Sequence, residues 1–166
     1  MRENTKDKVR RCARSAPALL LVLGGSLLGA PAIAQSQQQT EVQQAIDALW
    51  VQAGKLDVDQ SFGVSVPNEA GFYVLDGQVV WRREDTLALY RETFGAASKN
   101  DINMTDERIT VLAEDLALYV AAGSYNMEDA SGASMGSGPM ALTIIMKKDH
   151  DVWKILHLHQ SFPAMN

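Results

Sequence analysis

The stretch Val152-Trp153-Lys154-Ile155-Leu156-His157-Leu158-His159-Gln160-Ser161 is rich in residues that favour β-strands. Alternate residues of a strand point to the same face of a sheet. The pattern therefore predicts one face that carries Trp153, Ile155, His157, His159 and Ser161, and an opposite face with Lys154, Leu156, Leu158 and Gln160. Two imidazoles and a hydroxyl in line on one face make this strand the most chemically suggestive part of the chain.

Five further strands are predicted before this one, over residues 72–75, 78–81, 108–113, 116–127 and 141–148. Asp76-Gly77 joins the first two, and this pair permits the positive φ angles of a two-residue hairpin turn. Glu114-Asp115 joins the next two, and a Gly-, Ser- and Ala-rich loop over residues 131–138 leads to the fifth. The long strands are expected to form an antiparallel sheet.

Two helices are predicted on the N-terminal side of the long strands. Thr40-Glu41-Val42-Gln43 matches a capping box with Thr40 as the cap, and apolar residues follow at helical spacing as far as Ala53. Glu84 and Asp85 favour the start of a second helix, which is expected to end at Gly95. Helices segregated to one side of an antiparallel sheet indicate an α+β fold.

Residues 1–34 have the three parts of a secretory signal peptide. A basic head is followed by a short uncharged run, and Ala32-Ile33-Ala34 forms a small-x-small cleavage site before Gln35. The apolar run is shorter than the roughly 20 residues that span a bilayer. We therefore expect a signal peptide over residues 1–34, a disordered polar leader over residues 35–40, and a periplasmic or secreted protein without a membrane anchor after cleavage.

The charge balance and the cysteine content depend on this cleavage. The chain has 15 Lys and Arg and 20 Asp and Glu, and six of the bases and two of the acids lie in residues 1–34. The mature chain would thus keep nine bases and 18 acids, a net charge of −9. Such an acidic surface argues against nucleic acid and anionic lipid as partners. The single cysteine, Cys12, would leave with the signal peptide, so no disulfide is expected.

The last strand resembles that of SnoaL-like proteins, members of the nuclear transport factor 2-like superfamily. The resemblance rests on Lys147-Lys148, on the turn Asp149-His150-Asp151, and on Trp153 followed by His159-Gln160-Ser161. It covers residues 41–163 and implies a cystatin-like α+β fold, in which a cone-shaped, curved antiparallel sheet packs against N-terminal helices.

The same resemblance implies a homodimer, and a departure from the family limits what else can be carried over. Leu156 and Leu158 would suit a sheet-to-sheet contact between two copies. Relatives usually have a second helix and an acidic residue where this chain has the polar, irregular residues 55–70. No catalytic acid is therefore carried over to this segment.

The predicted ligand-binding residues are His157, His159, Ser161, Tyr125 and Arg108. If the histidine face of the last strand is concave, His159 and Ser161 line a pocket, where His159 acts as a hydrogen-bond donor or a general base. Arg108, at the start of a strand, would pair with an anionic ligand. The alternative is that one histidine is a hydrogen-bonded core residue and the other helps to hold a dimer. Arg108 would then form a surface ion pair with Glu107 or Asp106.

Tyr125 is the pocket candidate on the neighbouring strand. Gly123 lies two residues away on the same face and is expected to leave open space beside it. The alternative is that Tyr125 packs in the core together with Tyr119.

No metal site and no cofactor are expected. His157 and His159 lack a further ligand within reach in sequence, and the chain has no H-E-x-x-H motif and no Cys cluster. The acidic segment that begins at Asp57 resembles the start of a calcium loop, but Phe62 stands where such a loop has Gly.

Two functions remain open from the sequence. The first is an exported SnoaL-like domain with a small-molecule pocket and no assigned activity. The second is an enzyme of the same superfamily, because His157, His159 and Ser161 resemble the His-rich final strand of iota-class carbonic anhydrases. In that class a His and a Ser usually stand where this chain has Leu158 and Gln160. A ketosteroid-isomerase-like proton transfer is the other enzymatic alternative, and it would need a carboxylate in the pocket.

Overall fold

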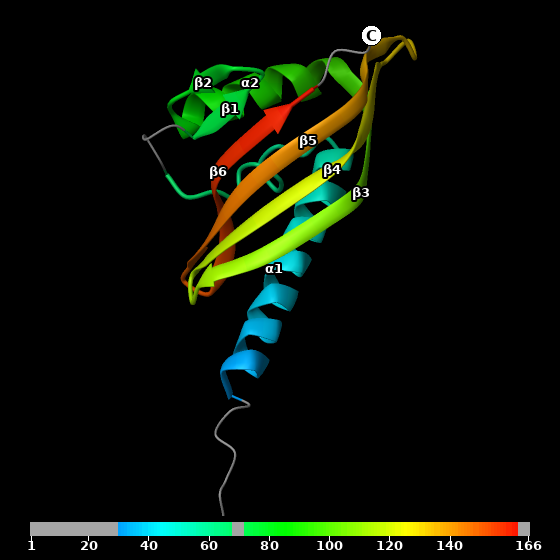
Figure 1. Cartoon of the computed structure of the whole chain (residues 1–166). Coiled ribbons are helices and arrows are strands. Elements are labelled where there is room, and N and C mark those ends of the chain that lie inside the picture. The colour runs from blue at the N-terminus through cyan, green and yellow to red at the C-terminus, as the bar shows by residue number, and fades with distance from the viewer. Residues whose placement is uncertain (1–29, 68–71, 163–166) are drawn as a thin grey trace, which may run out of the picture.

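A computed structural model of the chain describes residues 30–67 and 72–162 (Figure 1). A curved six-stranded sheet in the order β2-β1-β6-β5-β4-β3 packs against two helices. The elements, in chain order, are α1 (Ala30–Gly54), β1 (Tyr73–Leu75), β2 (Gln78–Val80), α2 (Arg83–Ala96), β3 (Ala97–Ala113), β4 (Leu116–Asp129), β5 (Ser134–Asp149) and β6 (Val152–Ser161). The predicted α+β fold with a curved sheet is thereby confirmed. The sheet is mixed, because β1 pairs with β6 in parallel.

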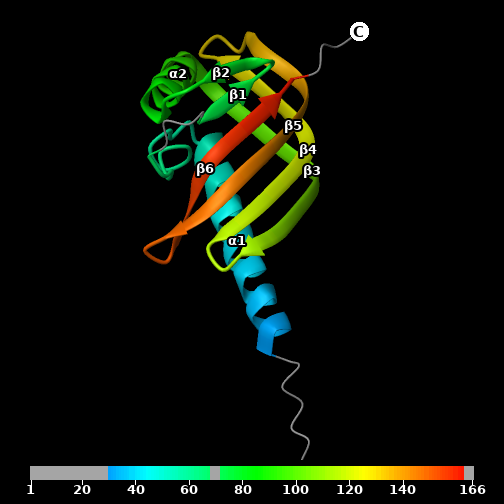
Figure 2. The same ribbon diagram turned by 60° about the vertical axis from the view of Figure 1, so that its left-hand side comes forward.

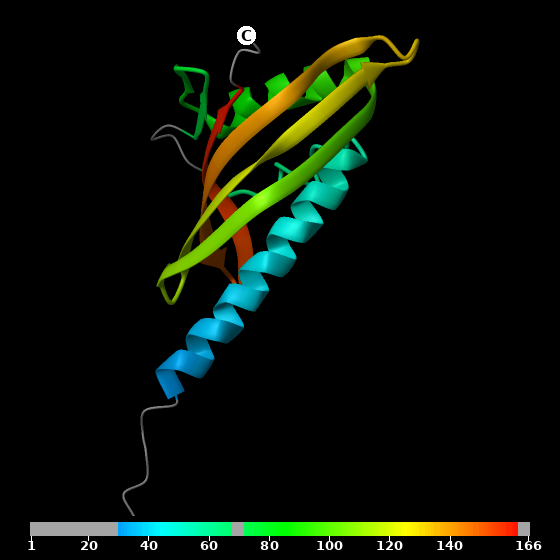
Figure 3. The same ribbon diagram turned by 45° about the vertical axis from the view of Figure 1, so that its right-hand side comes forward.

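The helix α1 runs diagonally along the concave side of the sheet and extends past its lower end (Figure 3). Its buried residues recur at helical spacing and pack on the inner face of the strands: Val42, Ile46, Leu49 and Ala53. Glu41 connects the helix to the sheet, because its carboxylate accepts hydrogen bonds from Lys148 Nζ at 2.9 Å and from Trp153 Nε1 at 3.3 Å.

The start of α1 differs from the sequence-based prediction. The helix is continuous through Thr40, so the predicted cap and the disordered leader over residues 35–40 are both wrong. Gln38 and Gln39 explain the difference, because their side-chain amides donate to the carbonyl oxygens of Glu114 and Ile109 at 2.7 and 3.1 Å. Residues 1–29 of the predicted signal peptide lie outside the described residues, and cleavage after Ala34 would fall within α1.

The hairpin β1–β2 continues the sheet beside β6, and the helix α2 lies next to this hairpin (Figure 2). Asp76 and Gly77 have φ angles of 45° and 83°, as the predicted tight turn requires. α2 ends at Ala96 and β3 follows without a loop. β3 therefore begins eleven residues before the predicted start at Arg108, and the pairing of its polar first half with β4 overrides the weak strand propensity of these residues.

The strand β5 also begins earlier than predicted. It starts at Ser134, so most of the loop expected over residues 131–138 is strand. Residues 134–138 pair with β4, which satisfies their backbone groups despite their high glycine content.

A β-bulge in β6 reverses which residues face the core. Ile155 pairs with Met146 of β5, whereas His157 pairs with Ile145, so β6 contains one extra residue, Leu156, between these two pairs. A bulge of this kind shifts the alternation by one position. Trp153 and Ile155 are buried before the bulge, and Leu158 and Gln160 are buried after it. The prediction that Trp153, Ile155, His157, His159 and Ser161 share one face is therefore wrong.

Candidate functional site

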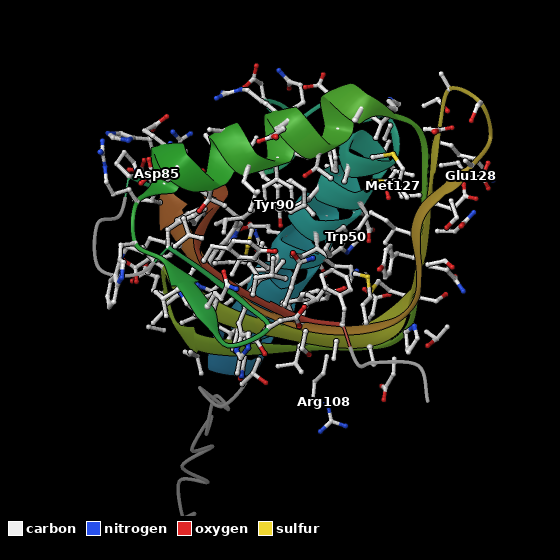
Figure 4. The ribbon with its side chains drawn as sticks, turned by 90° about the horizontal axis from the view of Figure 1, so that it is seen from above. Trp50, Asp85, Tyr90, Arg108, Met127 and Glu128 are labelled. Carbon is white, nitrogen blue, oxygen red and sulfur yellow. The ribbon has the colours of Figure 1, made fainter. Side chains whose placement is uncertain are left out.

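A cavity of about 270 Å³ lies on the concave side of the sheet, between the C-terminal end of α1, the helix α2 and the strands. Trp50 and Tyr90 point into this interior (Figure 4). The cavity is lined by Trp50, Phe62, Tyr73, Leu75, Leu89, Tyr90, Thr93, Phe94, Asn100, Ile102, Tyr125, Met127, Met135, Met140, Gln160 and Phe162.

One wall of the cavity consists of aromatic rings. Phe62 and Tyr90 are stacked, with ring centroids 3.9 Å apart and planes inclined by 3°. Tyr73 and Phe94 pack against Tyr90 with centroid distances of 5.6 and 5.8 Å. These mutual contacts hold the rings in place, so the wall keeps its shape without a ligand.

Another part of the wall is formed by side chains of β3, β4 and β5 and by the end of the described chain. Tyr125 and Phe162 meet edge to face at 4.8 Å. Met127 and Met140 lie on the same inner face of the sheet, and their unbranched thioether side chains adapt to irregular shapes. The cavity is thus lined both by packed aromatic rings and by adaptable methionine side chains.

The polar centre of the cavity is the side chain of Gln160. Its amide oxygen accepts hydrogen bonds from the hydroxyls of Tyr73 at 2.6 Å and Tyr90 at 2.7 Å. These three residues come from β6, β1 and α2, so the amide joins three elements. Gln160 is 5% exposed.

Both tyrosines are held in their neutral form. Burial raises the pKa of Tyr73 to about 12 and raises the pKa of Tyr90 well above its ordinary value of 10. Near neutral pH the two hydroxyls are hydrogen-bond donors and not bases.

A second polar group, formed by three residues, supports the back of the cavity. Trp50 Nε1 donates to the hydroxyl of Tyr119 at 3.2 Å, and this hydroxyl donates to Glu107 Oε2 at 2.7 Å. Burial, together with the hydrogen bond to Glu107, raises the pKa of Tyr119. The chain of bonds fixes the indole of Trp50 against the cavity.

The described lining of the cavity contains no Asp, Glu, His, Lys or Arg. Two of its other polar side chains already donate hydrogen bonds within the protein. Asn100 Nδ2 donates to the carbonyl oxygen of Ala53, and the hydroxyl of Thr93 donates to the carbonyl oxygen of Leu89. The carboxylate that a ketosteroid-isomerase-like reaction needs is therefore not part of this lining.

The residues predicted to bind a ligand are divided between the two faces of the sheet. Tyr125 lines the cavity. His159 and Ser161 lie at a shallow hollow on the outer face, beside Val120 and Thr143. The concave face is therefore not the one that carries His159 and Ser161, and their predicted ligand-binding and catalytic roles stay predictions.

Arg108 and His157 also lie away from the cavity lining. The side chain of Arg108 is exposed and points away from the helices (Figure 4). His157 pairs with Ile145 after the bulge and belongs to the same outer face as His159. Their roles in ligand binding likewise stay predictions.

The expectation that Gly123 leaves open space beside Tyr125 is wrong. A Cβ atom at Gly123 would lie 2.2 Å from the carbonyl oxygen of Asn103, because the backbone of β3 crosses closely there. The pairing of β3 with β4 is irregular at this place, between Met104 and Asp106. The glycine allows two backbones to approach and does not widen the cavity.

Sequence reasoning missed Gln160, Tyr73 and Tyr90 as members of the site. Gln160 had been placed on the face opposite His159, and that relative placement is correct. The sequence pattern gave no sign of the bulge at Leu156. This bulge determines which residues of β6 lie on the concave face of the sheet.

The described residues contain no cluster of three or more His, Cys, Asp or Glu side chains suited to a metal ion. Neither described helix combines the length and the apolar character needed to cross a membrane.

Comparisons with known proteins agree with this architecture. The family model described as SnoaL-like domain matches residues 42–165. A nuclear transport factor 2-like family protein from Streptomyces avermitilis superposes with a TM-score of 0.67 at 18% identity, covering 79% of this chain and 99% of that one. A superfamily protein from Salmonella enterica gives 0.64 at 14% identity, with 82% and 95% covered. A comparison with curated protein sequences finds no match.

A third solved structure has the same fold. It is a protein with a cystatin-like fold from Caulobacter vibrioides, with a TM-score of 0.63 at 16% identity over 76% of this chain and 91% of that one. Identities at this level show a shared fold and leave the function to the site.

Proposed function

The chain belongs to the SnoaL-like domain family, and on this basis we propose that it is an exported protein that binds a small, uncharged, largely aromatic molecule in its concave cavity. The observation that carries the proposal is the lining, in which aromatic, aliphatic and methionine side chains surround the amides of Gln160 and Asn100 and the described residues contribute no charge. Binding sites for small organic molecules are typically concave and apolar, with a few placed polar groups.

The lining also limits the charge and size of the ligand. A charged group brought into this cavity would lose its water without gaining a counterion from the described residues, which is strongly unfavourable. A volume of about 270 Å³ lies just below the usual range of roughly 300–1,000 Å³ for ligand pockets and suits a molecule of one to three rings.

No specific observation favours either enzymatic alternative. A ketosteroid-isomerase-like proton transfer needs a base within reach of the ligand, and the described lining offers none. The histidines that resemble the carbonic anhydrase strand lie near the outer hollow of the sheet, where His159 is exposed to solvent. We therefore propose binding, without an assigned reaction.

A titration with the uncharged fluorescent probe N-phenyl-1-naphthylamine tests this function. We expect a saturable rise in fluorescence with one probe per chain. Replacement of Ile102, which lines the cavity, by Trp would fill the space and abolish this rise. The matched variant Thr110→Trp places the same side chain at an exposed position of the same strand and should bind as the wild type does. Equal binding by both variants would place the probe elsewhere and contradict the proposal.

We also propose that the protein is a homodimer that pairs through the outer face of the sheet. The centre of this face is uncharged and consists largely of small or β-branched side chains, including Val120, Ala141 and Thr143. The contact differs from the one expected from the sequence, because Leu158 is fully buried on the inner face. A patch that pairs with its own copy about a two-fold axis must be self-complementary, and an uncharged patch avoids repulsion between like charges there.

Export to the periplasm or the medium rests on residues 1–34 alone, with their basic head, short apolar run and small-x-small site. The contacts of Gln38, Gln39 and Glu41 with the sheet lie beyond the proposed cleavage site, so the mature protein would keep the anchoring of α1.

A further inference from the structure

The amide nitrogen of Gln160 has a special position among the polar atoms of the cavity. The amide oxygen accepts the two tyrosine hydroxyls, at 2.6 and 2.7 Å, and the nitrogen makes no hydrogen bond with any described residue. Gln160 lies on the inner face and lines the cavity, so its amide is part of the cavity wall.

Two hydroxyls meet the oxygen of this amide. Tyr73 approaches from β1 and Tyr90 from α2, and each hydroxyl donates to Oε1. With Oε1 engaged by both tyrosines, Nε2 is the part of the amide that is left to meet a ligand. The two hydrogen bonds thus hold the amide in place before any ligand arrives.

We propose that Gln160 is a specificity-determining residue that donates a hydrogen bond from Nε2 to a carbonyl oxygen of the ligand. The ligand class that fits is an uncharged aromatic ketone or a related ring compound with one acceptor, placed among the rings and methionines. This inference rests on the proposed binding function and narrows the class of ligand.

Three hydroxyls of the lining are already engaged as donors, whereas that of Tyr125 makes no hydrogen bond with the described residues, so Tyr125→Phe, which should keep the preference for a ketone, is a required control. The hydroxyls of Tyr73 and Tyr90 already donate to Gln160, and the hydroxyl of Thr93 already donates to its own helix. A hydrocarbon of equal shape would leave Nε2 desolvated and without a partner, which costs binding free energy. A ligand carbonyl removes this penalty.

A pair of probes with matched shape tests the inference. 2-Acetylnaphthalene carries a carbonyl, and 2-isopropenylnaphthalene replaces its oxygen by a methylene group. The affinity of the full chain for each is measured by calorimetry or by quenching of tryptophan fluorescence. We expect the wild type to bind the ketone about two- to tenfold more tightly than the hydrocarbon, which corresponds to one typical hydrogen bond.

Two variants remove the donor with side chains of different shape. Gln160→Leu replaces the amide by a branched apolar side chain. Gln160→Met removes every polar atom, and its fold is checked by circular dichroism. In both variants the preference for the ketone should disappear. Thr93→Val, which also changes a cavity-lining polar residue, should keep the wild-type preference.

The outcomes separate this inference from the binding function itself. If the wild type binds neither probe, the proposed function fails. If it binds both equally, or if Gln160→Leu and Gln160→Met keep the wild-type preference, the binding function stands and the proposed role of Gln160 is wrong.

Discussion

The hydroxyl of Tyr90 in α2 donates a hydrogen bond of 2.7 Å to the amide oxygen of Gln160 in β6. This bond joins the helix to the last strand across the cavity, and the hydroxyl of Tyr73 converges on the same oxygen. The arrangement connects α2 and β1 to β6 at the wall of the cavity. It also leaves a single acceptor on which two buried donors depend.

The variant Tyr90→Phe should lower the free energy of unfolding by about 1 kcal/mol, because one net hydrogen bond is lost. Tyr73→Phe should have a similar effect. The double variant should cost more than the sum, since the amide oxygen of the buried Gln160 is then left without either donor. Urea denaturation measures all three. Tyr125→Phe is the control, because its hydroxyl makes no hydrogen bond with the described residues, and purely additive losses would contradict the shared acceptor.

The variant Gly123→Ala should destabilise the protein by about 1–3 kcal/mol, because the new methyl group would collide with the backbone at Asn103. Gly95→Ala is the matched change, since a Cβ there meets nothing within 4 Å and the residue lies in a helix. It should stabilise by up to about 1 kcal/mol. Thermal unfolding of both variants checks the contrast, and a neutral Gly123→Ala would show that β3 and β4 are not so close.

Stability should fall in alkaline solution because of Tyr73. The pKa of its hydroxyl is about 12 in the folded protein and about 10 in the unfolded chain, so the unfolded state ionises first. The contribution is fully present below about pH 10 and is lost between about pH 10 and 12, with a slope of about 1.4 kcal/mol per pH unit. Unfolding free energies of wild type and Tyr73→Phe, compared across this range, isolate the effect. Parallel curves for the two proteins would refute it.

The outer face of the sheet should carry the dimer contact. The change Val120→Arg adds a charge to the centre of this face, where Val120 is 43% exposed, and should convert a dimer into a monomer. Val152→Arg makes the same change at an equally exposed position at the start of β6 and should leave the dimer intact. Light scattering after gel filtration distinguishes the two states. A wild-type protein that stays monomeric at high concentration would contradict the proposed dimer.

The exported protein should begin at Gln35. Expression of the full chain in a bacterium with a periplasm, followed by intact-mass measurement of the periplasmic fraction, gives the processed length. We expect the mass of residues 35–166, and the change Ala34→Arg at the cleavage site should block processing. Recovery of the full-length chain from the cytoplasm would contradict export.

The fold could be predicted from the sequence further than the site could. The Asp76-Gly77 turn and the helix that includes Leu87 and Phe94 have strong local signals, and the structure agrees with both. The polar first half of β3 has no such signal, because its strand conformation depends on pairing with β4.

The site could not be predicted because one extra residue in β6 determines which side chains of this strand face the cavity. Strict alternation would place Gln160 and Ile155 on opposite faces of the sheet. Because of the bulge at Leu156, both residues lie on the inner face. A bulge of this kind has no reliable signature in a single sequence. The tyrosine partners of Gln160 come from β1 and α2, so only the assembled fold brings them together.

The most direct test of the account is a crystal structure of the protein grown with N-phenyl-1-naphthylamine. The account predicts electron density for one probe molecule in the concave cavity, enclosed by Tyr90, Met127 and Gln160. A cavity closed by its own side chains, with the probe bound on the outer face near His159 or absent, would contradict the proposed function.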